Sequence, residues 1–163
     1  MQRGALQSYQ HMLGAIGRYL DQHSYEDILL CELGDGFVGR VLQGGRLLAA
    51  IPFQASDLTG MVRAAAEETS RAQTIVPQPG LRRGSFLVRA LGSYRYFLDA
   101  LGGQLDRAEA TSILVAELSD SVLVVYRRAV GPHDSGAAAA SEYIYDECGV
   151  RKLMAGEVVS RGK

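Results

Sequence analysis

The chain has 163 residues, of which 47% are hydrophobic and 21% charged, and its formal net charge is −1. This composition predicts a folded domain and excludes disorder over most of the length, because so much apolar surface buries itself. A net charge this close to zero gives no overall electrostatic attraction to nucleic acid or to an anionic membrane. The sequence has no apolar run of the roughly 18–20 residues that span a bilayer, and no signal-peptide core in its first residues. We therefore expect a cytoplasmic protein with no membrane partner.

An internal repeat organises the sequence. Residues 8–43 align without gaps to residues 93–128 at an offset of 85, and 12 of the 36 aligned pairs are identical. Eight of the other 24 pairs exchange one apolar residue for another. Two copies are too few for a solenoid, so we expect them to face each other across a pseudo-two-fold axis. The identical pairs include Gly17/Gly102, Asp21/Asp106 and Glu32/Glu117.

The first copy predicts a helix, three strands and a second helix. Apolar residues with helical spacing follow Ser8, and the turn Gly34-Asp35-Gly36 joins two apolar strands. Ser56 is the expected cap of the second helix. The expected elements in chain order are a helix capped by Ser8, strands over 27–33, 37–43 and 46–53, and a helix over 57–75.

The second copy repeats this pattern less completely. Residues 131–140 predict a loosely ordered loop and make the third strand less distinct in this copy, but the coarse pattern is again a helix, three strands and a helix. The segment 76–92, which contains Pro77 and Pro79, is the expected linker between the copies. The expected elements are a helix capped by Ser93, strands over 112–118 and 122–128, and a final helix capped by Asp146.

Together these elements predict an α+β fold. We expect a single domain over 1–163, made of the repeats 8–75 and 93–160, with one antiparallel sheet of five or six strands and helices packed on it. The strands are apolar on both faces, which indicates cover on both sides, by helices or by the second subunit of a homodimer. Glycine in a helix interior is costly, so Gly17 and Gly102 predict a close backbone approach.

The sequence Gly34-Asp-Gly-Phe-Val-Gly39 has the form GxGxxG of a dinucleotide site. Such a site requires the motif to open a helix, whereas strand residues follow it here. The repeat copy carries Ser119, Ser121 and Val124 in place of the three glycines. We therefore interpret the motif as a hairpin turn.

Acidic residues recur in both copies as the pairs Glu32/Glu117 and Asp35/Asp120. Such a cluster could bind a hard cation or act as acid and base. No histidine or asparagine accompanies either pair at a useful spacing. We expect each glutamate to pair across its hairpin and each aspartate to shape its turn.

Histidine and cysteine give no catalytic or metal pattern. His133-Asp134-Ser135 has the residue types of a hydrolase triad, but adjacent residues in one loop cannot converge on one site. His11 and His23 are poorly spaced for a metal, and Cys31 and Cys148 form no CxxC motif. We expect packing roles for both cysteines, and no metal, cofactor or catalytic residue.

One stretch interleaves basic and aromatic residues, as nucleic-acid platforms do. It covers residues 82–97 and contains no acidic residue. The rest of the chain is acidic on balance, so an acidic protein surface is the preferred partner of this stretch. The expected partner-binding residues are Arg82, Arg83, Arg89, Arg95 and Tyr96.

These observations favour a non-catalytic binding or assembly protein that forms a homodimer and recognises a protein partner. The alternative is a nucleic-acid-binding protein that uses residues 82–97. A small-molecule or metal-dependent enzyme is the third hypothesis.

Overall fold

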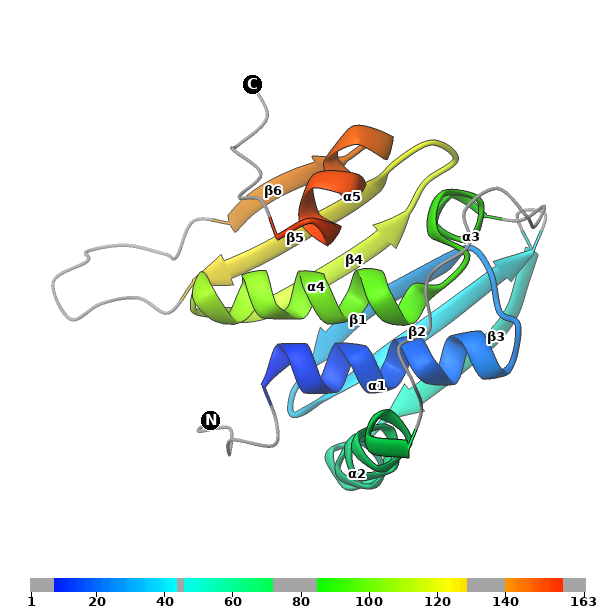
Figure 1. The fold of residues 1–163 in the computed structure, drawn as a ribbon, viewed down its shortest axis with the longest axis vertical. Helices are drawn as coiled ribbons and strands as arrows, with labels where there is room; N and C mark the ends of the chain where they lie inside the picture. The colour runs from blue at the N-terminus through cyan, green and yellow to red at the C-terminus, as the bar shows by residue number, and fades with distance from the viewer. Residues whose placement is uncertain (1–7, 44–45, 72–84, 129–139, 157–163) are drawn as a thin grey trace, which may run out of the picture.

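The computed structural model describes residues 8–43, 46–71, 85–128 and 140–156. Within them the fold is α+β, with helices packed on one face of a six-stranded antiparallel sheet (Figure 1). The elements in chain order are α1 (Tyr9–Gln22), β1 (Ile28–Leu33), β2 (Gly36–Gln43), β3 (Arg46–Phe53), α2 (Ala55–Arg71), α3 (Phe86–Leu91), α4 (Tyr94–Arg107), β4 (Ala110–Glu117), β5 (Val122–Arg128), β6 (Ala140–Tyr145) and α5 (Glu147–Met154).

The sheet has the strand order β3-β2-β1-β4-β5-β6. Strands that follow each other in sequence are paired neighbours, except at the centre, where β1 pairs with β4. In that central pair Leu30 lies opposite Val115. The first three strands thus form one half of the sheet and the last three strands the other.

Several local predictions are confirmed. The strand expected over residues 46–53 is β3 with the same bounds. The side chains of Ser8, Ser93 and Asp146 each accept a hydrogen bond from a backbone N–H in the first turn of their helix. The GxGxxG motif lies in the β1–β2 hairpin, where Gly34 has a φ of +62°. The interpretation as a turn is therefore correct.

Three local predictions need correction. Helix α2 begins at Ala55, so Ser56 lies inside it; Asp57 instead accepts a hydrogen bond from the Gln54 N–H (3.3 Å). The sixth strand, β6, starts at the last residue of the predicted loop. Helix α3 lies within the segment assigned to a linker, and four of its six residues are buried.

The hydrophobic core lies between the helices and the sheet and contains residues from both halves of the chain. Side chains of α1, α3 and α4 meet there with the inward-facing residues of the sheet, including Leu30 and Val115 at its centre. The largest fully buried side chains are Tyr9, Tyr94, Tyr145 and Phe97.

Helices α1 and α4 lie side by side at the middle of the helical layer (Figure 1) and touch through their backbones. A Cβ atom placed on Gly17 would lie 2.6 Å from the Cα of Arg95. A Cβ atom on Gly102 would lie 2.5 Å from the Cα of Gln10. Real Cβ atoms do not approach so closely, so the expected close backbone approach at both glycines is confirmed, and it is between these two helices.

Each of these helices also caps the other. The carboxylate of Asp21, near the end of α1, accepts hydrogen bonds from the backbone N–H groups of Tyr94 (2.8 Å) and Arg95 (3.1 Å). The carboxylate of Asp106, near the end of α4, accepts from Tyr9 (2.9 Å) and Gln10 (3.1 Å). A carboxylate at a helix N-terminus satisfies free N–H groups and opposes the positive end of the helix dipole.

We predict that Gly17→Ala and Gly102→Ala each lower the free energy of unfolding by about 1–3 kcal/mol, because the added methyl group must push two backbones apart. Gly60→Ala is the matched control. Gly60 lies in α2, and no atom lies within 4 Å of the position that its Cβ would take, so this change should raise stability by up to about 1 kcal/mol through helix propensity. Chemical denaturation checks all three variants. Stabilisation by alanine at positions 17 and 102 would contradict the backbone contact.

Candidate binding surface

Two partly buried glutamates link the helices to the sheet. Glu32 accepts hydrogen bonds from the Tyr9 hydroxyl (2.5 Å) and from the Ile113 N–H (3.2 Å). Glu117 accepts from the Tyr94 hydroxyl (2.6 Å) and from the Ile28 N–H (3.2 Å). Each carboxylate therefore joins a helix to the opposite central strand. The expected pairing of each glutamate across its own hairpin is wrong, because both side chains point toward the helical layer.

The surroundings of Glu117 shift two pKa values. Burial raises the pKa of Glu117 above its ordinary value of 4.5, against the opposing effect of hydrogen bonds from Tyr94 and the Leu87 N–H (2.7 Å). Burial and the neighbouring Glu117 carboxylate raise the pKa of Tyr94. A tyrosine that holds its proton so firmly is a hydrogen-bond donor at every physiological pH. Among the described residues, no buried side-chain nitrogen or oxygen atom lacks a hydrogen-bond partner.

The residues expected to bind a partner are placed as follows. Arg82 and Arg83 lie outside the described residues. Arg89, on α3, is exposed and donates to the Ser119 carbonyl (2.6 Å) in the β4–β5 turn. Arg95, on α4, donates to the Ala65 carbonyl (3.5 Å) of α2, and its neighbour Tyr96 is partly buried. The two described arginines thus hydrogen-bond to different elements.

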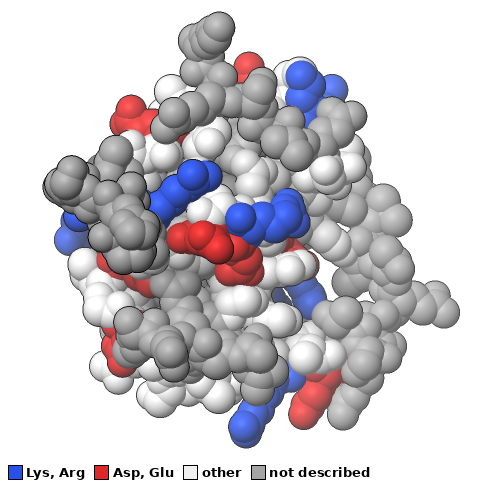
Figure 2. All heavy atoms as spheres, turned by 90° about the vertical axis from the view of Figure 1, so that its left-hand side faces the viewer, with Lys and Arg blue, Asp and Glu red and all other residues white. Residues whose placement is uncertain are grey.

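Aromatic rings of the same stretch lie in the core: Phe86 is 7% exposed and Tyr94 is fully buried. Burial is also the main cause of a raised pKa at Tyr96. On the side of the molecule drawn in Figure 2, acidic and basic side chains are interspersed. The described residues drawn there form no extended area of one charge (Figure 2).

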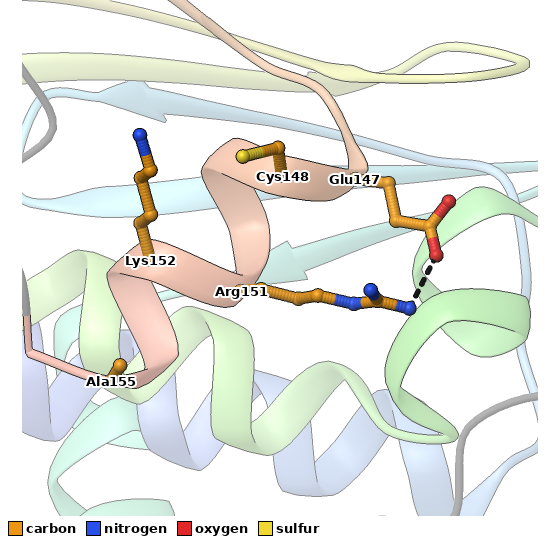
Figure 3. Close-up of a pocket in the computed structure, with 5 residues that line it drawn as sticks. All are labelled: Glu147, Cys148, Arg151, Lys152 and Ala155. Carbon is orange, nitrogen blue, oxygen red and sulfur yellow. Dashed lines mark hydrogen bonds and ion pairs between the residues drawn. The ribbon is translucent and has the colours of Figure 1, made fainter.

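A hollow of about 520 Å³ lies over α5 (Figure 3). Its described lining residues lie on the outward side of α5 and at its end, and Arg151 is turned to Glu147, with which it forms an ion pair of 2.6 Å. Cys148 is exposed there, so the packing role expected for it is wrong. The buried side of α5 carries Gly149, Val150 and Leu153 instead.

The other candidate residues in the described part of the chain form no metal-binding cluster. His133-Asp134-Ser135 lies outside the described residues. Among the described residues no three His, Cys, Asp or Glu side chains are arranged to hold a metal ion. His11 bonds to its neighbour Ser8 (2.7 Å), and His23 stacks on Tyr25 with the ring centres 5.4 Å apart.

The most extensive surface that the described elements leave uncovered is the sheet face turned away from the helices. None of the described helices packs on it (Figure 1). We call it the open face. Residues directly opposite each other on paired strands point to the same face of the sheet, so their side chains form continuous rows across the open face. Its central residues are apolar and come from the four middle strands: Leu29, Cys31, Val38, Leu114, Ala116, Leu123 and Val125.

The large exposed hydrophobic side chains also belong to this side. Ile144 pairs with Leu123 across β5 and β6 and is 67% exposed. Leu33 and Leu118, 59% and 44% exposed, continue the outward alternation of β1 and β4. Leu47 lies on β3, is 58% exposed and belongs to the same face by its register with β2. Every large hydrophobic side chain that is exposed in the described part of the chain therefore extends the open face.

Part of this surface can be found in the sequence alone. Alternation along residues 28–31 and 113–116 already places Leu29, Cys31, Leu114 and Ala116 on a common side of their strands. The outer members require the strand order and register, which place Val38 beside Cys31 and Ile144 beside Leu123. No local pattern in the sequence signals that the helices gather on the other side.

The raised pKa of Glu117 predicts a pH dependence. In the folded chain Glu117 keeps its proton at pH values above 4.5, at which the unfolded chain has released it. The free energy of unfolding should therefore fall as the pH rises through the raised pKa. Relative to Glu117→Gln, the wild-type chain should lose free energy of unfolding between pH 4.5 and pH 7.5. Urea unfolding at several pH values measures this difference. Parallel pH profiles for the two proteins would contradict the predicted shift.

In the described part of the chain, no helix has the length and apolar character required to cross a bilayer. Comparisons with protein-family models, curated proteins and solved structures gave no match.

Proposed function

We propose that this chain is a non-catalytic binding or assembly protein that forms a homodimer through the open face and recognises a protein partner. The observation that carries the proposal is the apolar character of that face. Its central side chains are apolar, and the exposed Leu33, Leu47, Leu118 and Ile144 extend it outward. Monomers seldom leave a continuous apolar patch of this kind in water.

The size of the open face suits a dimer. Six strands spaced about 4.8 Å apart, each about six residues long, cover on the order of 600 Å² in projection. The real surface is larger because side chains stand up from it. A standard protein interface buries about 800 Å² on each partner. Face-to-face packing of two such sheets would bury the apolar side chains in a layer about 10 Å thick, as in a β-sandwich.

We further propose that residues 8–75 and 93–160 are two copies of one unit, related by a pseudo-two-fold axis through the Leu30–Val115 pair. The support is that contacts recur at the offset of 85. Asp21 and Asp106 cap opposite helices, and Gly17 and Gly102 contact opposite backbones. The two copies would then contribute equivalent halves of the open face.

Nucleic-acid binding through residues 82–97 stays the second hypothesis. It has less support, because the rings of Phe86 and Tyr94 lie in the core and cannot stack on bases. A steep salt dependence of binding to generic DNA would favour it.

We expect the wild-type chain to sediment as a dimer at micromolar concentration. Leu114→Arg, at the centre of the open face, should give a folded monomer, because a buried unpaired charge opposes association. Ala155→Arg places the same side chain at an exposed site at the end of α5 and should leave the dimer intact. Sedimentation velocity separates these outcomes, and circular dichroism checks the fold. A wild-type monomer at all accessible concentrations would overturn the proposal.

The two cysteines supply an internal probe of the same proposal. Cys31 lies on the open face, whereas Cys148 is exposed on α5. Alkylation of Cys31 by a maleimide should slow at least about tenfold as the protein concentration rises through the dimer dissociation constant. The rate at Cys148 should not change. Equal concentration dependence at both thiols would argue against burial of the open face.

A further inference from the structure

The open face carries charges in an arrangement that selects one orientation of a second copy. We propose that two copies pack face to face with their two-fold axis parallel to the strands, so that Arg40 of each copy pairs with Glu142 of the other. This inference rests on the proposed homodimer and adds the geometry and the residues that determine it.

The register defines two adjacent rows of side chains across the open face. One row contains Ala50, Arg40, Leu29, Ala116, Leu123 and Ile144. The next contains Pro52, Val38, Cys31, Leu114, Val125 and Glu142. Each row thus carries one charged residue among apolar ones. Arg40 stands in the first row on β2, and Glu142 stands in the second row on β6.

These two charges are too far apart to meet within one copy. The strand order places four strand spacings between β2 and β6, which is about 19 Å. Both side chains are exposed, and among the described residues neither forms an ion pair. Arg127, a diagonal neighbour of Glu142 on β5, is the other charged side chain beside it on this face.

A two-fold axis that relates two facing sheets must lie in the plane between them. If the axis runs along the strands, β2 of one copy faces β5 of the other, and β3 faces β6. Glu142 of the second copy then lies over β3. It is displaced from Arg40 by one strand across the sheet and by one row along the strands. Sheets in a sandwich are about 10 Å apart. Arginine and glutamate side chains are long enough to bridge this diagonal, and symmetry forms the contact twice.

If the axis instead runs across the strands, each strand faces its own copy. Arg40 would then lie next to Arg40 of the second copy, and Glu142 next to Glu142. Two like-charge contacts at the border of an apolar interface are unfavourable. The charge pattern therefore favours the axis along the strands.

Charge reversal tests the orientation. Arg40→Glu and Glu142→Arg should each weaken dimerisation about tenfold or more at low ionic strength, because each variant creates two like-charge contacts. The effect should shrink in 0.5 M salt. The double variant R40E/E142R should regain the wild-type dissociation constant, because it restores both opposite-charge contacts. Arg63→Glu, an exposed change of the same sign on α2, is the control and should have no effect.

Sedimentation equilibrium gives the dissociation constants, and the outcomes separate the two proposals. A wild-type dimer that is indifferent to both single variants would overturn the orientation and leave the homodimer standing. Single variants that weaken the dimer without rescue in the double variant would also overturn it. A monomeric wild-type chain would overturn the proposed function itself, and the orientation with it.

Discussion

The contact between the backbones of α1 and α4 determines the arrangement of the helical layer. Gly17 and Gly102 bring the helices close enough that no Cβ atom fits between them. At that distance Asp21 and Asp106 reach the first turn of the neighbouring helix and hold its free N–H groups. The tyrosines that begin the helices then reach Glu32 and Glu117 on the sheet. Packing, capping and attachment to the sheet therefore follow from one geometric condition.

The same arrangement explains why the described helices leave one sheet face uncovered. The glutamates that bind Tyr9 and Tyr94 draw both central helices to a single side of β1 and β4. Helices α2, α3 and α5 lie on that side too (Figure 1). The strands nevertheless carry apolar residues on the other side, such as Leu29 and Leu114. Leucines on a face where none of the described helices packs are what the proposed homodimer would cover.

Much of the fold is visible in the sequence because its signals are local. Helical spacing and serine caps identify α1 and α4, and alternation with turn residues identifies the first hairpin. The failures depend on contacts between distant residues. Strand β6 begins with Ala140 and Ser141 after a run of alanines, and only pairing with β5 makes it a strand. The Glu117 carboxylate accepts from the Leu87 N–H, which no side-chain pattern can reveal. The open face likewise becomes visible only when strand order brings its rows together.

The helix contact also constrains sequence change in an unequal way. Each glycine touches main-chain atoms of the other helix, at Gln10 and at Arg95, and every residue type possesses those atoms. The contact itself therefore places no demand on the side chains at positions 10 and 95, while it holds positions 17 and 102 to glycine. Covariation between the partners of this contact would be undetectable even in a deep alignment. This close backbone contact would leave the signature of two unrelated invariant positions.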